Sequence, residues 1–467
     1  MLTRPRIYKE ALMSLAPPGS STFAALALDP IPFVRGLSQL FSERRLRTIL
    51  SRTNRGSERR RRLPAQSVIW LVVAMALFAA DSIPKVWRRL HPTRDQPEPT
   101  DAAFTQARRR LGVAPLRQLF LETARPMATH QTIGAFYRGW RLMGLDGTVL
   151  DLPDTPENAR TFGRPTSGRA DGAFPQVRLL ALCELGTHAI CGLAIKPLCH
   201  GETSMVGPLL DDLGPGMLLI WDRGFLSYEL IRSVCQRGCH LLARVKSNTI
   251  LEPLRRLDDG SYLAKIYPDA GDRRHDLRGM MVRVIEYTHD DPRRPGAGQR
   301  HRLITDLLEP AQMPAHEAPL VYHERWEEEL AFDEIKTHLS SRALPIRSKT
   351  PAGVVQEIYG LILAHYVIRR VMHDAAVVAC QDPDRLSFID SLRILQCQLP
   401  ESPDHGVDTW YRRLLGEVRR QKLRPRRDRW YARVIKQKMS KWPKKRPQHR
   451  RPPQPTKPFW QSIVILI

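Results

Sequence analysis

Apolar stretches of helical length occupy the first part of the chain. They lie at residues 33–50, 66–80, 101–111 and 116–124. A run of arginines separates the first two stretches and Gly112 joins the last two, as expected where helices end at a polar segment or a glycine. The pattern therefore predicts an α-helical N-terminal domain over residues 1–135.

The helix pair at residues 101–124 carries Arg108, Arg109 and Arg110 on its first member. Such a pair can bind DNA as a helix-turn-helix unit, but helical bundles with a solvated basic face are about as common. No base-contacting residue can be identified, so DNA binding by the N-terminal domain is a hypothesis at this point.

After residue 141 the apolar runs become short and are bounded by glycine and proline, which is typical of strands. Strands are predicted at residues 142–152, 176–185, 189–197, 217–221 and 240–245, and helices at residues 204–213 and 228–237. The order of three strands, helix, strand, helix and strand is that of a ribonuclease H-like fold. Fold order alone is weak evidence for an activity.

The next segment is richer in charged and turn residues. Its strand-like pieces lie at residues 262–267, 281–287 and 301–305. Helical periodicity returns at residues 322–339 and 354–378. We therefore predict an α/β, ribonuclease H-like catalytic domain at residues 136–247 and 320–400, interrupted by a β-rich insertion at residues 248–319.

The chain is strongly basic, with 73 Lys+Arg against 48 Asp+Glu, a net charge of +25 and a pI near 10.3. Residues 412–457 hold 19 lysines and arginines and two acidic residues, or +17 of that total. This excess indicates a polyanionic partner, with nucleic acid the first candidate. We expect residues 401–467 to form a basic C-terminal tail that binds DNA phosphates, with a merely solubilising tail as the alternative.

Membrane insertion and secretion are not expected. The longest apolar run, residues 68–80, has 13 residues, whereas a spanning helix needs about 20. No apolar stretch with a cleavage site follows the N-terminus. The seven cysteines, an odd number spread through apolar segments, predict reduced thiols in a cytoplasmic protein, and their spacing does not fit structural zinc.

Two aspartates occupy positions that are costly for a solvated carboxylate. Asp146 lies inside the predicted strand 142–152, and Asp222 directly follows the apolar strand 217–221. A charge there needs a partner or a metal ion, and the end of a central strand is a common place for a site. A salt bridge would satisfy either aspartate equally well. Nearby competitors are Asp151, Asp154, Asp211 and Asp212.

A third carboxylate is expected on the helix predicted at residues 322–339. On a wheel of about 100° per residue, one face of this helix presents a phenol, two bases and an acid within roughly 60°. These residues are Tyr322, Arg325, Glu329 and Lys336. Glu324, Glu327, Glu328 and Glu334 point elsewhere on the wheel. Asp333 lies on the same face, so the wheel does not decide between Asp333 and Glu329.

The spacing of these four residues resembles the YREK signature of insertion-sequence-4 family transposases. The stretch 145–148 (LDGT) is similar to the family's first-aspartate strand, and residues 222–225 (DRGF) resemble its second-aspartate motif. The family has a β-rich insertion between its second aspartate and its glutamate, and here 106 residues separate Asp222 from Glu329. The helical residues 63–90 and 105–112 resemble its N-terminal domain.

The resemblance implies a DDE transposase, which cleaves transposon ends and joins them to target DNA. It implies that Asp146, Asp222 and Glu329 hold two Mg²⁺ or Mn²⁺ ions, and it favours Glu329 over Asp333. Tyr322, Arg325 and Lys336, with Arg223 of the DRGF motif, would bind the DNA end. The implied partners are double-stranded DNA, in the form of terminal inverted repeats and target, and a second copy of the chain in a synaptic homodimer.

Two alternatives remain. A ribonuclease H-like nuclease would use the same carboxylates but would not need the phosphate-binding face of Tyr322, Arg325 and Lys336. A non-enzymatic DNA-binding protein derived from a transposase would keep the basic regions without activity. The complete set of three carboxylates argues against this second alternative.

Overall fold

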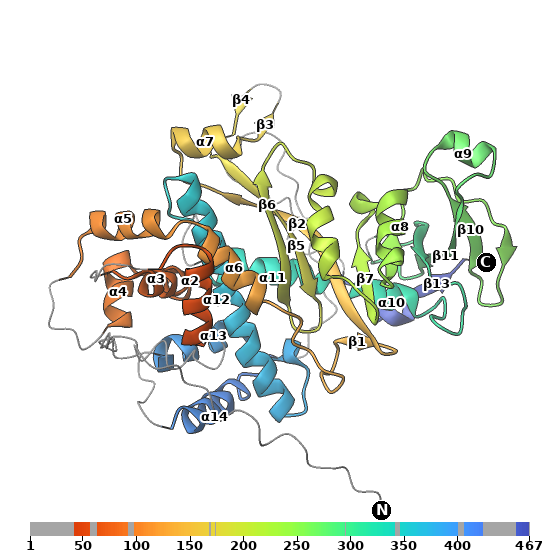
Figure 1. Ribbon diagram of the computed structural model, residues 1–467. Coiled ribbons are helices and arrows are strands. Elements are labelled where there is room, and N and C mark those ends of the chain that lie inside the picture. Colours follow the sequence, from red (N-terminus) through yellow and green to blue (C-terminus); the bar gives the residue numbers. More distant parts are fainter. Residues whose placement is uncertain are drawn as a thin grey trace, which may run out of the picture.

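The computed structural model describes residues 42–56, 63–91, 98–167, 170–172, 174–294, 296–340, 346–399, 406–423 and 454–466. Helices gather on one side of the molecule and a long sheet extends to the other (Figure 1). The part of the predicted helix 33–50 that precedes residue 42, and most of the basic tail, lie outside the described residues.

The described part of the N-terminal region contains five helices, four of which the periodicity predicts, while α4 is additional. They are α2 (Glu43–Arg52), α3 (Ala65–Leu77), α4 (Ile83–Leu90), α5 (Asp101–Leu111) and α6 (Ala114–Thr123). Ser42, Ser82 and Thr100 cap α2, α4 and α5 by accepting a hydrogen bond from a backbone N–H of the first turn. Helix α3 is buried from Ser67 to Leu77 and forms the centre of this region.

Helix α12 (Pro351–Val378) connects the helical region to the sheet. It packs against α3, α6 and β6, and one hydrophobic core contains residues of all of them. Among the described residues it is the one helix long and apolar enough to cross a membrane, but 83% of its most apolar window is buried inside the protein. Its apolar surface is therefore used by the core.

The central sheet begins with five strands in the order β6-β5-β2-β7-β8. They are β2 (Trp140–Asp151), β5 (Gln176–Glu184), β6 (Ala189–Pro197), β7 (Met217–Trp221) and β8 (His240–Arg244), with the two-residue β1 (Phe136–Tyr137) paired to β2. β2, β5 and β6 are antiparallel neighbours, whereas β2, β7 and β8 run parallel. The sequence predicts all five principal strands to within two residues.

The connections between these strands differ in part from the prediction. Helix α7 (Pro156–Phe162) and the hairpin of β3 (Thr166–Ser167) and β4 (Ala170–Asp171) lie between β2 and β5, and α8 (Tyr228–Gln236) joins β7 to β8. The prediction of an α-helix at residues 204–213 is wrong. Two 3₁₀ segments, η1 (Glu202–Met205) and η2 (Gly207–Asp212), replace it, because Gly207 and Pro208 interrupt an α-helix at its centre.

Residues 248–319 supply strands that continue the same sheet. β9 (Arg255–Arg256), β10 (Tyr262–Ile266), β11 (Met280–His289) and β12 (His301–Thr305) follow β8 in the order β8-β12-β11-β10-β9, and all these pairings are antiparallel. The short helix α9 (Ala270–Arg274) joins β10 to β11. The three strand-like pieces of the sequence are thus β10, β11 and β12.

The helix predicted over residues 322–339 is not continuous. Helix α10 (Ala318–His323) is followed after two residues by α11 (Trp326–Asp333), which passes into a π-helical segment, η4 (Glu334–His338). The regular wheel of the sequence prediction is therefore wrong for this segment. A π segment adds about one residue to a turn and so shifts the side chains that follow it relative to a regular helical wheel.

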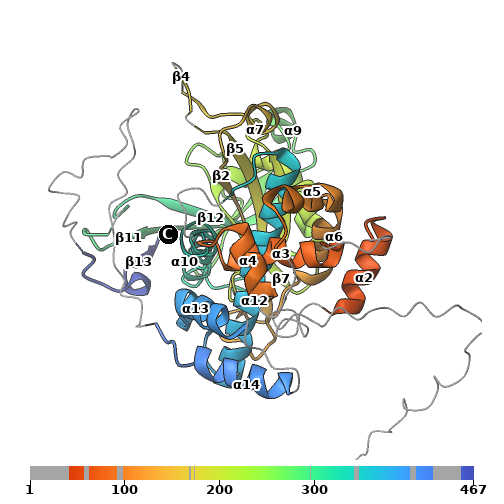
Figure 2. The same ribbon diagram turned by 90° about the vertical axis from the view of Figure 1, so that its left-hand side faces the viewer.

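The described C-terminal residues contact two parts of the molecule, the helical region and the far end of the sheet. The turn η5 (Pro383–Arg385) leads to α13 (Phe388–Gln398) and α14 (Val407–Val418), which pack against α12 at the end of the molecule opposite α7 (Figures 1 and 2). After the undescribed residues 424–453, η7 (Phe459–Gln461) and β13 (Ile463–Ile465) follow, and β13 pairs with β11. The prediction of a DNA-binding tail rests mainly on residues 424–453, which lie outside the described residues.

Candidate active site

The sheet brings Asp146 and Asp222 next to each other. Leu145 of β2 is the register partner of Trp221 of the parallel strand β7, so the residues that follow them, Asp146 and Asp222, are neighbours across the strand pair. Adjacent strands lie about 4.8 Å apart. The two carboxylates that the sequence selects therefore project from one edge of the central sheet.

Strand alternation fixes the face to which these side chains point. Leu219 and Trp221 belong to the core under α8, whereas Leu218 and Ile220 face the core that contains Tyr322 of α10. Because successive side chains alternate between faces, Asp222 follows Leu218 and Ile220 toward α10. By the same alternation Asp146 follows Leu142 on that face. The helical segment α10–α11–η4 covers the sheet where both aspartates emerge.

Asp146 is largely buried, with 23% of its side chain exposed. Its Oδ1 accepts a hydrogen bond of 2.8 Å from the Gly147 backbone N–H, and its Oδ2 lies 3.5 Å from Arg325 Nη1. Burial raises its pKa to about 6, although the Gly147 hydrogen bond and the Arg325 charge act in the opposite direction. The neighbouring carboxylates Glu202 and Glu329 add to the rise.

Asp222 caps the short turn η3 (Arg223–Phe225) and contacts α10. Its Oδ1 accepts hydrogen bonds from the backbone N–H of Arg223 at 2.7 Å and from the Tyr322 hydroxyl at 3.4 Å. Burial, and after it the charge of Asp222, raise the pKa of Tyr322 above its usual range. Tyr322 is therefore a neutral hydrogen-bond donor, and the Arg223 side chain is exposed beside it.

Arg325 joins the third carboxylate to the first. Its Nη2 donates to Glu329 Oε1 at 3.0 Å while its Nη1 faces Asp146. Arg325 lies between α10 and α11, and its side chain is only 10% exposed. The guanidinium is therefore held between two of the three carboxylates, where it partly offsets their mutual repulsion.

A hollow exposes Asp146 and Glu329 to solvent. Asp146, Gly147, Thr148, Trp326, Glu329, Leu330, Phe332, Asp333 and Lys336 line it. Lys336 is partly buried, and this burial lowers its pKa. The hollow contains Asp333 as well as Glu329, so both acids left open by the sequence are present. The Thr337 hydroxyl donates a hydrogen bond to Asp333 Oδ1 at 2.7 Å, and His338 Nε2 lies 3.1 Å from Asp333 Oδ2. Glu329 instead forms an ion pair with Arg325.

The four competing aspartates have ordinary partners. Asp151 accepts a hydrogen bond from Gln176, and Asp154 contacts Arg164. Asp211 and Asp212 form surface ion pairs with Arg237 and Arg125, each at 3.1 Å. These contacts fit the solvated or paired role that the sequence allows for acids at the ends of elements.

Sequence reasoning missed Glu328 as a component of the site. Its carboxyl group is fully buried under β2, and a Cβ built on Gly144 would lie 2.4 Å from its Oε2. Burial, and after it the charge of Asp146, raise the pKa of Glu328 well above its usual range, which favours the neutral acid. Gly144 therefore allows α11 to approach the sheet closely, two residues before Asp146.

The N-terminal region and the sheet each match a known family of domains. Residues 33–121 match the insertion element 4 transposase N-terminal family, and residues 141–367 match the transposase DDE domain family. The putative transposase InsZ of Escherichia coli (strain K12) is 31% identical over 212 residues, which are 44% of this chain and 69% of that protein. The chain belongs to the insertion element 4 family of DDE transposases.

A longer relative supports the same assignment. The transposase InsG for insertion sequence element IS4 of Escherichia coli (strain K12) is 29% identical over 397 residues, which are 82% of this chain and 88% of that protein. A solved piggyBac transposase synaptic complex with hairpin DNA shares 13% identity, with a TM-score of 0.42 over 83% of this chain and 85% of that one. The DDE-domain match spans all three carboxylates of the site, from β2 into α12.

The transposase has a second group of acidic and histidine side chains on the other side of α11. Among the described residues, His188, Glu327 and Asp384 place possible ligand atoms within 4.8 Å of one another. Glu327 and Glu329 are two positions apart and therefore point to roughly opposite faces of the helix. The second group is thus separate from Asp146, Asp222 and Glu329.

Proposed function

We propose that this transposase cuts the ends of its element and joins them to target DNA with Asp146, Asp222 and Glu329 as the ligands of two Mg²⁺ or Mn²⁺ ions. The observation that carries the proposal is the juxtaposition of Asp146 and Asp222 at adjacent parallel strands, with Arg325 linking Asp146 to Glu329. Hard divalent cations prefer carboxylate oxygens. Burial raises the pKa of Asp146, and the nearby carboxylates Glu202 and Glu329 add to the rise, so a bound cation would stabilise the ionised form.

The strand order supports a ribonuclease H-like catalytic fold with an insertion. Three antiparallel strands followed by two parallel strands, in the order β6-β5-β2-β7-β8, form its core, and β9–β12 extend the sheet between the second aspartate and the glutamate. We assign the catalytic domain to residues 136–247 and 320–400 and the β-rich insertion to residues 248–319. The N-terminal domain, residues 1–135, and the tail 401–467 would bind DNA.

The divalent ions, when bound, activate the attacking oxygen and stabilise the leaving oxygen of the phosphodiester. The residues of the chain supply the remaining functions. Tyr322 keeps its proton, and its hydroxyl, which donates to Asp222 in the structure, can donate to a phosphate oxygen instead. Arg325, Lys336 and the exposed Arg223 provide positive charge for the DNA backbone. Water is the nucleophile of the first cut, and the freed 3′ hydroxyl is the nucleophile of the joining step.

Cleavage of a labelled duplex that carries one end of the element tests this proposal. Purified transposase with Mn²⁺ should nick the end and then join it to an unlabelled second duplex, which gives a product longer than the substrate. Nicking without the joined product would favour the nuclease alternative. DNA binding without either product, under Mg²⁺ and under Mn²⁺, would favour the alternative of a non-enzymatic DNA-binding protein derived from a transposase.

The proposed partners follow from the same reaction. Two element ends must be brought together, so we expect a homodimer on a pair of terminal inverted repeats, acting in the cytoplasm on chromosomal DNA. Sedimentation of the transposase with and without a terminal-repeat duplex tests this expectation. A complex of two chains and two duplexes supports it, whereas one chain per duplex at saturating concentrations of both contradicts it.

A further inference from the structure

The three proposed ligands are held in place by different means. Asp146 lies within the hydrogen-bonded ladder of β2, and Asp222 follows β7 directly. Glu329 stands on α11, a helix outside the strand ladder of the described sheet, so its distance from the aspartates depends on the packing and side-chain contacts of α11. Arg325 supplies such a contact on the front of the helix.

A buried ion pair holds the back of the same segment. Glu334, the first residue of η4, accepts a hydrogen bond from Arg369 Nε at 2.8 Å, and a second contact to Arg369 Nη2 makes the pair bidentate. His365 Nε2 lies 2.9 Å from the same carboxylate. Both Arg369 and His365 belong to α12, a long and largely buried helix of the core, so Glu334 ties η4 to the core.

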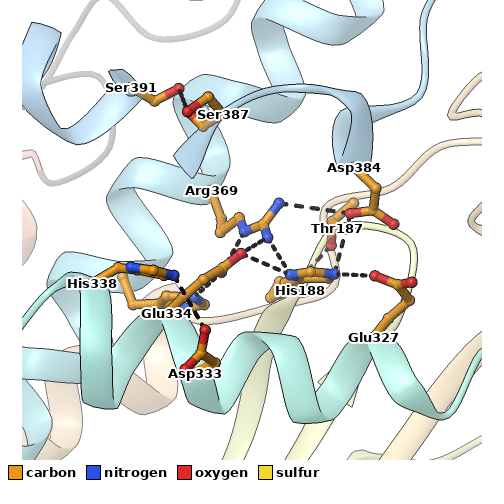
Figure 3. Close-up of polar contacts among 12 residues, drawn as sticks. Thr187, His188, Glu327, Asp333, Glu334, His338, Arg369, Asp384, Ser387 and Ser391 are labelled. Atoms are coloured by element: carbon orange, nitrogen blue, oxygen red, sulfur yellow. Dashed lines mark hydrogen bonds and ion pairs between the residues drawn. The ribbon is translucent and has the colours of Figure 1, made fainter. Parts of the chain in front are cut away.

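His188 extends the ion pair to two more elements. It lies in the turn between β5 and β6 with a φ of 55°, and its Nδ1 is 3.2 Å from Glu334 Oε1. Its Nε2 is 2.9 Å from Glu327 of α11 and 3.2 Å from Asp384 of η5. Figure 3 shows the His188 ring between Glu334 and Glu327, with Arg369 and Asp384 above them. The continuous helical segment α11–η4, called the active-site helix below, is thus held at Glu327 and at Glu334, seven residues apart.

Two cations, Arg369 and protonated His188, face three carboxylates in this network, and burial raises the pKa of one of the three, Asp384, to about 7. Burial and Arg369 lower the pKa of His188, but Asp384, Glu334 and Glu327 outweigh them and raise it to about 9. Arg369 and His188 hold the pKa of Glu334 well below its usual range despite its burial. The raised pKa of His188 favours the protonated ring, which bridges carboxylates and cannot ligate a metal ion. Arg369 Nη2 also contacts His188 Nδ1.

We propose that the buried network of Glu334, Arg369, His188, Glu327 and Asp384 is the positioning device of the active-site helix, and that it sets the divalent-metal affinity of the active site by holding Glu329 against Asp146. The inference rests on the proposed function, since it assigns metal binding to Glu329. The network residues are positioning residues, because none of them belongs to the proposed metal ligands or to the proposed DNA-binding side chains.

Two substitutions remove network contacts with little change of shape. Glu334→Gln keeps the volume and removes the charge. His188→Asn removes the imidazolium and keeps a residue type that tolerates positive φ. The matched control is Glu357→Gln on α12, which breaks another buried pair, with Arg108 at 3.1 Å, away from α11. All three variants should lower the thermal midpoint, so stability alone does not distinguish them.

Mn²⁺ binding, measured by the EPR signal of the free ion with a terminal-repeat duplex present, is the deciding readout. Glu334→Gln and His188→Asn should bind Mn²⁺ about ten- to a hundredfold more weakly, the range found when groups that orient metal ligands are removed. Glu357→Gln should bind it as wild type does. DNA binding without metal should stay the same in all four proteins. Equal Mn²⁺ affinity in the network variants and the wild type would overturn the inference.

Hydrogen–deuterium exchange separates this inference from the proposed function. Peptides covering residues 326–339 should exchange faster in Glu334→Gln than in wild type, while those covering β7 should not change. Failure of this result overturns the inference whatever the metal data show, whereas absence of Mn²⁺ binding in wild type overturns the proposed ligand set. A Mn²⁺ ion retained by Asp146→Asn/Asp222→Asn/Glu329→Gln would place an ion at His188 and also overturn the inference.

Discussion

At the scale of single residues, the sequence could select the two aspartates as candidates because they break an apolar pattern. Asp146 and Asp222 are charges in or next to buried strands, and the structure places them side by side. The sequence could not identify Glu328, because a helical wheel does not show that Gly144 leaves space for a carboxyl group under the sheet. The helical wheel could not decide between Glu329 and Asp333, a choice that the family resemblance made in favour of Glu329; in the structure Glu329, and not Asp333, is paired with Arg325.

Burial of Asp146 should make the metal-free protein less stable. Its folded-state pKa of about 6 exceeds the usual 3.8, so its contribution to stability is present below about pH 4 and is lost as the pH rises through 6. A shift of this size corresponds to roughly 3 kcal/mol. Asp146→Asn should therefore raise the thermal midpoint in EDTA at pH 8, and the gain should shrink toward pH 4. A lower midpoint at pH 8 would show that the carboxylate is well compensated without metal.

The close approach at Gly144 predicts a specific steric effect. A Cβ there would lie 2.4 Å from Glu328 Oε2 and 2.7 Å from Leu185 Cδ2. Gly144→Ala should cost about 1–3 kcal/mol, as overpacking usually does, and should also reduce cleavage by displacing α11. Adding Glu328→Ala should recover part of the stability, which chemical unfolding of the single and double variants measures. Additive losses would show that the two positions do not interact.

At the scale of elements, strands were predicted better than the segments that cover them. β6, β7 and β12 agree with the sequence prediction at both ends, because apolar runs bounded by glycine, proline and charge mark buried strands. The helix predicted at 204–213 failed on Gly207 and Pro208. The one predicted at 322–339 failed because tertiary contacts of Arg325 and Glu334, invisible in the sequence, divide it into three pieces.

The network behind α11 should make stability depend on pH in the alkaline range. The pKa of His188, raised from 6.5 to about 9, gives a contribution that is complete below pH 6.5 and is lost as the pH rises through 9. The expected loss is on the order of 3 kcal/mol. The thermal midpoint of wild type should therefore fall between pH 7 and 9.5, and that of His188→Asn should fall less. Parallel curves would show that His188 is not the titrating group.

At the scale of the whole molecule, the sequence predicted the types of region but not how they join. The expected helical domain and the expected catalytic domain share one core around α12, because a helix assigned to one region by its position packs against α3 and α6 of the other. The β-rich segment continues the central sheet at β8. Edge-to-edge pairing of this kind leaves no pattern in a single sequence.

The C-terminal residues are tied to the sheet through Asp291. Its carboxylate accepts hydrogen bonds from the backbone N–H groups of Thr456 and Lys457, and with Arg293 these lower its pKa to about 2 despite burial. Asp291→Ala should free β13 from β11. Carboxypeptidase digestion followed by mass spectrometry should then remove residues 463–467 faster than in wild type at pH 7. An equal rate would mean that strand pairing alone holds the segment.

The central claim is that Asp222, with Asp146 and Glu329, performs metal-dependent cleavage at element ends. The most direct test compares wild type with Asp222→Asn on a labelled terminal-repeat duplex in Mn²⁺, with DNA binding measured in parallel. The substitution keeps the size of the side chain and removes the charge. We predict that Asp222→Asn binds the duplex as wild type does and yields neither nick nor joined product. Cleavage by Asp222→Asn at a rate near that of wild type would contradict the assignment of the active site.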